Sequence, residues 1–410
     1  MSNFLKVKPI EKALEIIDNH PTPLLRTVNI KTIDSVSRTV SKPITSSSNL
    51  PNFNRSTMDG YAVRAIDTYG ASQNQPSYLN LVSEIKMGAI PKTNLKVGQA
   101  ARIFTGAMIP QSADAVVMIE YTELIDSSLI EIIKPVAPGE NIIKIGEDIQ
   151  VNEPVFTVGH VIRPQDIGGL LALGITKTPV FKRPKIGVIS TGDELINPEI
   201  EPAKGQIRDI NTYTISALIQ KYGGEPITFG INKDEFEVQL ETAKKALSEC
   251  SIVVISAGSS TSSRDLTSQV ISSLGEPGIL MHGLAHKPGK PSIIGSAQDK
   301  LIFGLPGNPV SAMIIFSLLV KRAIQNILCS PKELIAATKA ILTANIPSIN
   351  GREEHVPVKL FNSRSGDLMA EPVFGKSNLI YTLIKSDGIV VVPINKSGIY
   401  SGDLVDVLIN

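Results

Sequence analysis

Strands and helices alternate along residues 183–311, and this alternation constrains the fold more than any other feature of the chain. Each predicted strand is a short apolar run bounded by turn residues: Lys185–Ser190, Pro226–Gly230, Ser251–Ser256 and Leu301–Phe303. Helical patterns lie between them: Asn211–Tyr222, Lys233–Ser248 and Asp265–Leu274. Strands separated by helices of roughly 10–15 residues form a parallel sheet with right-handed crossovers. The segment is therefore predicted as an α/β domain.

Three of these strands end in polar turns that contain glycine: Ser190–Glu194, Ser256–Ser260 and Gly304–Pro309. Because ligands of open α/β sheets bind beyond the carboxyl ends of the strands, we expect the three turns to share one edge. In the last turn, Gly304 and Gly307 would permit positive φ or a close ligand approach, and the apolar run after Pro309 is predicted as a buried helix. A strand, a glycine turn and a helix N-terminus together make an anion site, although the same residues also suit a plain tight turn.

Acidic residues follow two of the strands. Asp193 and Glu194 come directly after the first strand, where paired carboxylates can hold Mg²⁺, orient a ligand or cap a helix. Asp265 follows the serine-rich stretch 258–263 and has similar alternatives: a helix N-cap, or a residue that places a metal beside a phosphate-binding turn. The local sequence leaves these interpretations open.

Two lysines stand on a stiffened turn, Lys287–Pro291, which precedes the last strand. A lysine acts as a point charge and suits a phosphate or another oxyanion, although most lysines are simply solvated. His282 and His286 have the i, i+4 spacing of a metal pair, but no helical pattern surrounds them, and Gly283 argues against one. We therefore predict an anion-binding role for the two lysines and disfavour a metal role for the histidines.

Other stretches flank or interrupt the α/β pattern. Short β-like runs with turns between them occupy about 64–145, and a further set fills the tail from about 330. Helices are predicted at residues 6–18 and from Pro164 to near Gly174, with Asp166 in the first turn of the second. We predict an α/β multidomain chain with four parts: a segmented linking domain of 1–50 and 145–182, an inserted β-rich domain of 51–144, the α/β domain of 183–329 and a C-terminal β domain of 330–410.

Composition narrows the partners and the compartment. A net charge of +1 over 410 residues, aromatic residues at 5% and no tryptophan give no basis for nucleic-acid binding. No apolar run reaches the roughly 18 residues of a membrane span, so no membrane partner is expected. The two cysteines, Cys250 and Cys329, lack a CxxC spacing. Two cysteines that are far apart in sequence suggest a reducing compartment and no structural metal, and a cytoplasmic location is expected.

Taken together, the motifs resemble those of the MoeA molybdopterin molybdenumtransferases, a family that includes the E domain of gephyrin. The matching stretches run in family order along the chain: Ser56–Val63, Phe104–Ala107 with Pro110, Asp114–Val117, Gly146–Ile149, Ser190–Leu195, Ile207 with Asn211, Lys287–Pro291 and Gly304–Ser311. Each motif alone is weak, but the whole series in this order is specific. The termini match in length and pattern.

The resemblance implies an elongated homodimer whose α/β domain is a molybdopterin-binding domain. It also implies a reaction: adenylylated molybdopterin and molybdate give molybdenum cofactor and AMP, with Mg²⁺ as the assisting cofactor. In similar proteins the cleft lies between the α/β and C-terminal domains of one subunit and is closed by the inserted domain of the other. Other proteins of cofactor synthesis are further expected partners.

Roles carried over by motif fall into two groups. The residues expected in catalysis are Asp59, Thr105, Asp148, Glu194, Asp265 and Lys287. The first three would come from the closing subunit, whereas Glu194 and Asp265 would also place Mg²⁺. The residues expected to bind the substrates are Thr191, Gly192, Asp193, Asn211, Asp234, Gly258, Ser259, Ser260, Lys290, Gly304, Pro306, Gly307, Asn308, Pro309 and Ser311.

The chain departs from the family pattern at three positions. Ala257 and Ser262 stand where glycines are usual, which would hinder backbone approach to the pyrophosphate or let Ser262 donate a bond instead. Gly283 stands where some members have a lysine. Two alternatives stay open: the same transferase acting on tungstate, and a molybdopterin-binding or scaffolding protein without turnover. A generic nucleotide-phosphate enzyme is disfavoured because the chain has neither GxxxxGK[ST] nor GxGxxG.

Overall fold

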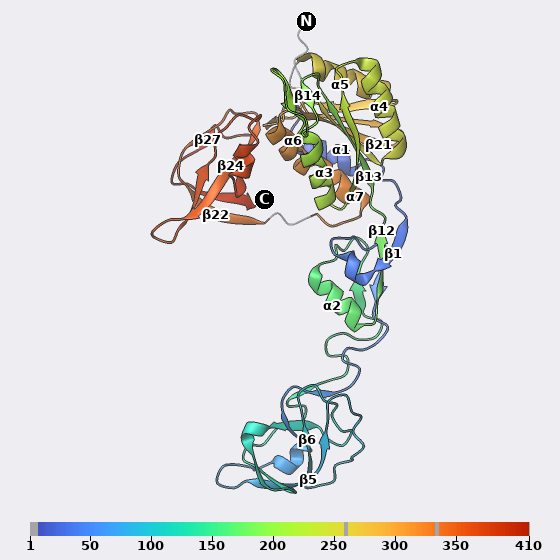
Figure 1. Ribbon diagram of the computed structural model, residues 1–410. Coiled ribbons are helices and arrows are strands. Elements are labelled where there is room, and N and C mark those ends of the chain that lie inside the picture. The colour runs from blue at the N-terminus through green and yellow to red at the C-terminus, as the bar shows by residue number, and fades with distance from the viewer. Residues whose placement is uncertain (1–6, 258–260, 333–335, 410) are drawn as a thin grey trace.

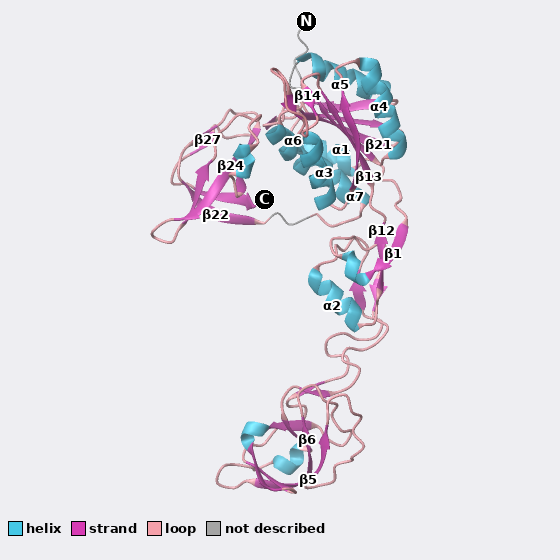
Figure 2. Cartoon of the chain, viewed as in Figure 1, coloured by secondary structure: helices cyan, strands magenta, loops and turns pink. Residues whose placement is uncertain are grey.

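A computed structural model describes residues 7–257, 261–332 and 336–409 of the chain, with the backbone alone described at 261–265. These residues form an elongated molecule (Figure 1). An α/β domain carries a β-barrel at its side, a small unit that contains α2 lies beyond it, and a β-rich unit lies at the far end. Most helices gather around the α/β sheet, whereas strands and loops dominate the far unit (Figure 2).

The α/β domain contains a six-stranded sheet in the order β16-β13-β17-β21-β20-β18. Its strands are β13 (Lys185–Thr191), β16 (Glu225–Asn232), β17 (Ile252–Ala257), β18 (Pro277–His282), β20 (Ile293–Ala297) and β21 (Lys300–Pro306). Neighbours among β16, β13, β17 and β21 run parallel, which confirms the predicted α/β alternation. Short strands β14 (Leu195–Ile196) and β15 (Ile207–Arg208) pair beside it.

The far edge of this sheet differs from the prediction of a parallel sheet. Strands β18 and β20 are antiparallel additions, with β20 bonded to β21. The β20–β21 hairpin turns through Gln298 and Asp299, whose φ values are 53° and 56°. Two successive residues with positive φ are typical of a type I′ turn, which usually carries asparagine or glycine. This turn was missed because it lacks the usual residues.

Helices cover both faces of the sheet. One apolar cluster joins the sheet to α3 (Asn211–Lys221) and to the helical segment after β21, and a second joins it to α4 (Phe236–Glu249) and α5 (Thr261–Ser273). Successive residues of a strand point to opposite faces, so Val254 enters the first cluster and Val253 the second. The continuous apolar strands are therefore explained by a sheet that is buried on both sides.

The predicted helix after Pro309 runs through three segments: α6 (Pro309–Ile315), the π-helical η4 (Phe316–Val320) and α7 (Lys321–Ile327). By length and composition this helix could cross a membrane. In the structure it packs in the core instead, because Phe316, Leu319 and Ile324 are fully buried in the first cluster.

Helix α1 (Ile10–Asp18) packs against α7 through Ile10, Ala13 and Ile17. Residue Asp18 also accepts two hydrogen bonds from Arg322. We assigned residues 1–50 to the linking domain, but this helix lies with the α/β domain. The apolar stripe of this segment correctly predicted a helix, whereas the surface on which that helix packs is set by tertiary contacts.

The linking unit is built from two separated stretches of chain. Its elements are β1 (Thr27–Lys31), η1 (Thr32–Ser35), β2 (Ile44–Thr45), β11 (Pro154–Phe156), α2 (Pro164–Ala172) and β12 (Lys177–Phe181). Strand β1 pairs with β12, and β2 pairs with β11. The predicted helix from Pro164 is confirmed, with Asp166 bonded to the backbone N–H of Arg163 at its start.

Asp166 gives this unit a pH-dependent stability. Its burial alone would raise its pKa, but hydrogen bonds from Arg163 and His160 outweigh burial and lower the pKa to about 2. A depressed carboxyl pKa stabilises the fold above the unfolded pKa near 4, and this stabilisation is lost as the pH falls through 2. We expect Asp166→Asn to cost about 2 kcal/mol at pH 7 in urea unfolding, with the gap closing between pH 4 and pH 2. The exposed Asp34→Asn is the control, and a gap that does not change with pH contradicts this account.

The far unit holds a six-stranded sheet in the order β7-β4-β6-β5-β9-β8. Its elements are β3 (Arg55–Ser56), β4 (Gly60–Val63), η2 (Ala65–Thr68), β5 (Ser77–Ile85), β6 (Gln99–Ile103), β7 (Ala115–Met118), η3 (Ile119–Tyr121), β8 (Thr122–Asp126), β9 (Leu129–Ile132) and β10 (Ile142–Ile143). The β-rich character is as predicted. Strand β4 was not foreseen, because its short apolar run follows a glycine that resembles a turn residue.

Gly60 is that glycine, and close packing requires it there. A Cβ at this position would lie 1.9 Å from the backbone oxygen of Val117, which cannot move without breaking the β4–β7 pairing. We expect Gly60→Ala to destabilise the far unit by about 3 kcal/mol, seen as faster hydrogen exchange in its peptides. Gly70→Ala is the control, since its Cβ would meet nothing within 4 Å and only its positive φ opposes it. Equal effects of the two changes would rule out the packing explanation.

The C-terminal domain is a β-barrel. Its elements are β22 (Ala337–Leu342), β23 (Ile346–Pro347), β24 (Glu353–Asn362), β25 (Leu368–Pro372), α8 (Tyr381–Ile384), β26 (Gly388–Val392), β27 (Gly398–Ile399) and β28 (Leu404–Ile409). The sheet closes because β26 pairs with both β28 and β24. Strand β19 (His286–Lys287) of the α/β domain adds to β24 in parallel and ties the two domains together.

Candidate functional site

A cleft of about 650 Å³ lies between the α/β domain and the barrel. The α/β side of the cleft is formed by residues 286–291 and by the segment that links β21 to α6. The barrel side is formed by Arg352, the stretch 354–357 and the stretch 373–377. Five residues predicted to act at the site line this cleft: Lys287, Lys290, Pro306, Asn308 and Ser311.

The cleft is strongly cationic although the chain as a whole is nearly neutral. Four cationic side chains line it, Lys287, Lys290, Arg352 and Lys376, against the single carboxylate of Glu354. The formal excess is thus three positive charges, compared with +1 for the entire chain. Cations gathered in a concave site attract anions even when the overall charge is close to zero.

The two predicted lysines have different surroundings. Lys287 forms an ion pair of 2.7 Å with Glu354, which also accepts a hydrogen bond from Ser348. The charge of Lys287 is therefore partly offset, and its ion pair joins the α/β domain to the barrel. Lys290 has no salt-bridge partner among the residues that the structure describes, so its charge is free for a ligand.

The turn after β21 differs from the prediction. Strand β21 continues to Pro306, and neither Gly304 nor Gly307 has positive φ. Gly304 instead lies in a tightly packed part of the core, because a Cβ there would lie 3.1 Å from the Cβ of Ile293. The N–H of Val310 donates to the backbone oxygen of Ser377, so it is not free to bind an anion.

This turn docks on the barrel and on the sheet. Asn308 donates to the hydroxyl of Ser377 at 2.9 Å, and Pro309 begins α6. Asn211 donates to the oxygen of Gly307 and to the hydroxyl of Ser256, each at 2.8 Å. The ends of β17 and β21 thus lie together, as predicted, with Asn211 holding them in place.

A second group of predicted residues lies at the ends of β13 and β16. The carboxylate of Glu194 folds over Gly192, where a Cβ would lie 2.8 Å from Oε2. Asp234 lies close to two acids: burial first, and then the charges of Asp193 and Glu194, raise its pKa. The hydroxyl of Thr191 is buried and has no hydrogen-bond partner among the residues that the structure describes.

These donors fit a hard cation. Carboxylate and hydroxyl oxygens are the ligands that Mg²⁺ prefers, and a cation would relieve the repulsion that raises the pKa of Asp234. Strand β17 alone separates β13 from β21, so this acidic group and the cationic cleft share one edge of the sheet. Asp193 and Asp234, which we expected to bind substrate, therefore lie beside Glu194, which we expected to bind metal.

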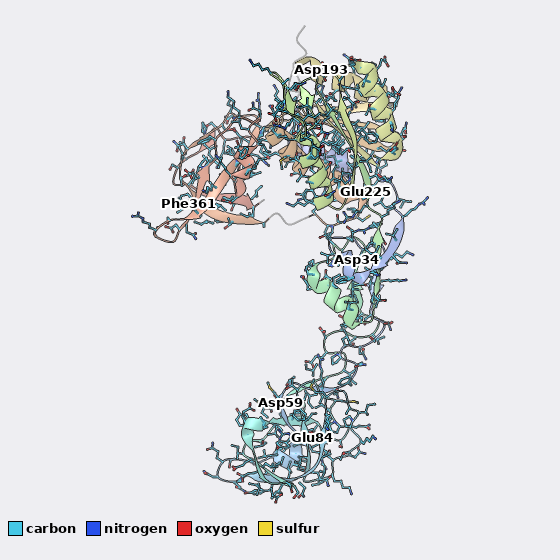
Figure 3. The ribbon with its side chains drawn as sticks, in the orientation of Figure 1. Asp34, Asp59, Glu84, Asp193, Glu225 and Phe361 are labelled. Atoms are coloured by element: carbon cyan, nitrogen blue, oxygen red, sulfur yellow. The ribbon has the colours of Figure 1, made fainter. Side chains whose placement is uncertain are left out.

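Three predicted residues lie away from this edge. Asp59 accepts hydrogen bonds from the N–H and hydroxyl of Thr105 at 2.7 and 2.9 Å, and both residues are exposed. In Figure 3, Asp59 lies in the far unit and Asp193 at the opposite end of the molecule. Asp148 is exposed where the chain returns from the far unit. Within one chain these residues do not meet the cleft.

Four further predictions cannot be placed. Gly258, Ser259 and Ser260 lie outside the described residues, and so does the side chain of Asp265. The same holds for the side chain of Ser262. The backbone of α5 begins at Thr261, before Asp265 where we predicted the helix to start.

Sequence reasoning missed every barrel residue of the cleft. Arg352, Lys376 and Ser377 contribute charge and hydrogen bonds to it. Two weak signals were present: Arg352 follows Gly351 before a strand, and the stretch 375–377 reads Gly-Lys-Ser. Neither resembles a known binding motif, so their place in one cleft with Lys290 comes from the docking of the barrel.

Comparison with known proteins identifies the family. Residues 8–174 match the model of the MoeA N-terminal region, 187–326 that of a probable molybdopterin binding domain, and 339–409 that of the MoeA C-terminal region. The chain belongs to the MoeA family. The resemblance that the motifs carried is therefore confirmed, and so is the multidomain fold class.

Relatives of this MoeA-family chain cover nearly its whole length. The molybdopterin molybdenumtransferase of Bacillus subtilis is 33% identical over 92% of this chain and 88% of its own. That of Staphylococcus epidermidis is 30% identical over 94% of this chain and 91% of its own. The crystal structure of a molybdopterin biosynthesis MoeA protein from Pyrococcus horikoshii OT3 is 32% identical, with a TM-score of 0.86 over 99% of this chain and 100% of that one.

Proposed function

We propose that this MoeA-family chain is a molybdopterin molybdenumtransferase of molybdenum cofactor biosynthesis. Its substrates are adenylylated molybdopterin and molybdate, and its products are molybdenum cofactor and AMP. The observation that carries the proposal is the cationic cleft between the α/β domain and the barrel, which Lys290 lines from one domain and Arg352 from the other. Both substrates are multiply charged anions, and fixed cations offset the repulsion between them.

The residues at the sheet edge divide the work. Lys290, Arg352 and Lys376 hold the anionic groups, and Asn211 fixes the end of β21 through Gly307. When the phosphoanhydride bond breaks, AMP leaves with the bridging oxygen, and the attacking oxygen comes from molybdate or from water. The leaving group carries negative charge, which the same cations stabilise.

Mg²⁺ would be held at the acidic edge, by Glu194 with Asp193 and Asp234, and by Asp265 as the motif implies. When bound there it would neutralise pyrophosphate charge and polarise a phosphoryl oxygen. Gly192 leaves the space that the carboxylate of Glu194 occupies, and this keeps the carboxylate at the edge.

The active assembly is proposed as a homodimer. Asp59 and Thr105 are exposed and remote from the cleft of their own chain, as a contribution from one subunit to the cleft of another requires (Figure 3). The proposed location is the cytoplasm, which suits two unpaired cysteines.

The test is incubation with adenylylated molybdopterin, Mg²⁺ and either molybdate or tungstate, while the release of AMP is followed. Release that requires an oxyanion supports the transferase, and the faster oxyanion identifies the preferred metal. Tight binding of the pterin without release of AMP would favour the scaffolding protein instead.

A further inference from the structure

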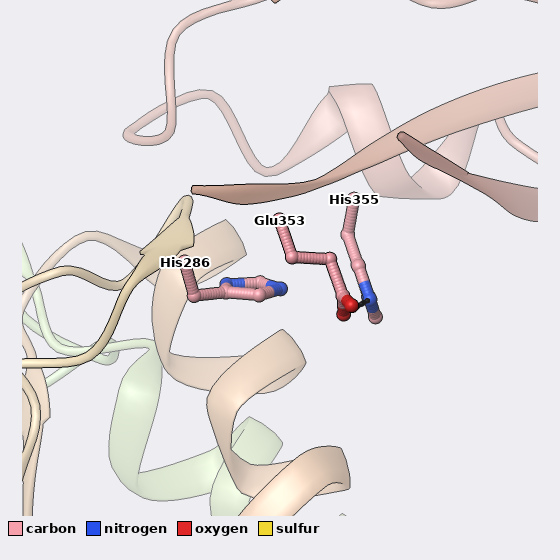
Figure 4. Close-up of side chains that lie close together, drawn as sticks. All are labelled: His286, Glu353 and His355. Atoms are coloured by element: carbon pink, nitrogen blue, oxygen red, sulfur yellow. Dashed lines mark hydrogen bonds and ion pairs between the residues drawn. The ribbon is translucent and has the colours of Figure 1, made fainter. Parts of the chain in front are cut away.

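Three side chains meet where the α/β domain docks on the barrel. His286 comes from β19, and Glu353 and His355 come from β24. In Figure 4 the ring of His286 approaches the other two side chains from the opposite domain. One possible ligand atom from each residue lies within 4.8 Å of the others. His286 and Glu353 are register partners in the two strands, and Glu353 and His355 share a strand face because they are two residues apart.

His286 presents an unused lone pair to this cluster. Its side chain is fully buried, and its Nδ1 donates to the backbone oxygen of Pro288 at 2.5 Å. Because Nδ1 carries the proton, Nε2 is bare, and it has no hydrogen-bond partner within the described part of the chain. Burial first, and then the neighbouring His355, lower the pKa of His286 to about 4, so the ring is neutral at pH 7. A buried acceptor without a partner is unfavourable unless a ligand satisfies it.

The other two side chains complete a set of donors. Glu353 accepts a hydrogen bond of 3.0 Å from Nε2 of His355. That bond lowers the pKa of Glu353 and outweighs burial, which would raise it. The cluster is therefore an anionic carboxylate with two imidazoles. His286 and His355 also line the cleft, so a fourth position faces the cleft.

We propose that His286, Glu353 and His355 bind one divalent cation of the Zn²⁺ type, which ties the α/β domain to the barrel at the rim of the cleft. Two histidines and one glutamate with an open fourth position are a recurrent Zn²⁺ ligand set. Imidazole ligands favour Zn²⁺, Co²⁺ or Ni²⁺ over Mg²⁺, which distinguishes this site from the carboxylate edge at Glu194. On binding through Nε2, the ring of His355 takes the tautomer that carries its one proton on Nδ1, and its hydrogen bond to Glu353 is replaced by the ion. The inference does not depend on the transferase proposal.

The experiment uses the full chain after treatment with a chelator. Titration with Co²⁺ should give the intense visible absorption of a four-coordinate ion at one equivalent per chain, and Zn²⁺ should displace it. An excess of Mg²⁺ should not. Zn²⁺ should also slow hydrogen exchange in peptides that cover β19 and the start of β24, because the ion joins these strands.

Three variants and one control locate the ion. We expect His286→Gln, Glu353→Gln and His355→Gln each to weaken Co²⁺ binding at least about 100-fold, whereas His20→Gln, which lies outside the cluster, should bind as the parent does. Glu353→Gln keeps the size of the side chain, and circular dichroism reports whether each variant folds. The proposal is overturned if the parent chain binds neither Co²⁺ nor Zn²⁺, or if the ion still binds to all three variants.

Discussion

Replacing Asp59 by Asn lowers the rate of AMP release by on the order of 100-fold, although Asp59 lies far from the cleft of its own chain. Two donors of Thr105 orient its carboxylate. The hydrogen bond from the backbone N–H of Thr105 is the largest cause that lowers the pKa of Asp59, so this exposed carboxyl group stays ionised. In the proposed dimer this fixed carboxylate enters the partner's cleft. The measurement is the rate of AMP release at saturating substrates.

Asp126 offers a matched control in the same unit. It accepts two bonds from Ser128 at 2.7 and 2.9 Å, and its pKa is lowered in the same way. Asp126→Asn should therefore leave the rate within about twofold of the parent. If both variants behave alike, the effect belongs to the stability of the unit and not to catalysis.

Mixing variants tests whether two chains share one cleft. A chain with Asp59→Asn and a chain with Lys290→Ala are each nearly inactive under this model. After unfolding and refolding together in equal amounts, half of the dimers are mixed, and each of these has one intact cleft, so activity should return to about a quarter of the parent value. No recovery, despite mixed dimers seen by native mass spectrometry, would mean that a cleft does not combine Asp59 of one chain with Lys290 of the other.

Replacing Lys290 by Ala lowers kcat/KM by on the order of 100-fold, and Lys290→Glu lowers it further. The reason is that Lys290 lines the cleft without a salt-bridge partner in the described part of the chain. No neighbouring carboxylate offsets its positive charge, so the substitution removes a full charge from the cleft. The measurement is kcat/KM for adenylylated molybdopterin at several salt concentrations. The variant should also respond less to salt, because one screened attraction is gone.

Two comparisons make this prediction specific. Lys359, which is exposed on β24, serves as the control, and Lys359→Ala should change kcat/KM less than twofold. Lys287→Ala should also loosen the barrel, because Lys287 forms the ion pair with Glu354. An effect of Lys290→Ala below about threefold would mean that the cationic cleft does not bind the substrate.

Local patterns predicted most of the elements correctly. The apolar strands from Lys185 to Phe303 and the helices between them follow from periodicity, because a sheet covered on both faces needs continuous apolar runs. Asp166 at the start of α2 was likewise predicted, since capping acts within one turn of chain. Elements that lack a local signal were missed, such as the hairpin through Gln298 and Asp299.

Roles assigned to single residues were less predictable. Gly304 was expected to permit positive φ or a close ligand approach, but its φ is not positive and it packs against Ile293. Lys287 was expected to bind an oxyanion, and no local pattern indicated the ion pair that it forms with Glu354. A glycine or a lysine has the same local pattern in either role, so only the neighbours decide between them.

By itself the sequence determined the α/β alternation, the edge at which its turns gather and the family to which the chain belongs. Only the tertiary structure decided that β19 pairs with β24, and that pairing brings Arg352 into one cleft with Lys290 and places His355 beside His286. The physical reason is the distance along the chain over which each kind of signal acts. Periodicity and capping act over a few residues of chain, whereas the docking of the barrel joins surfaces whose complementarity no single stretch of sequence contains.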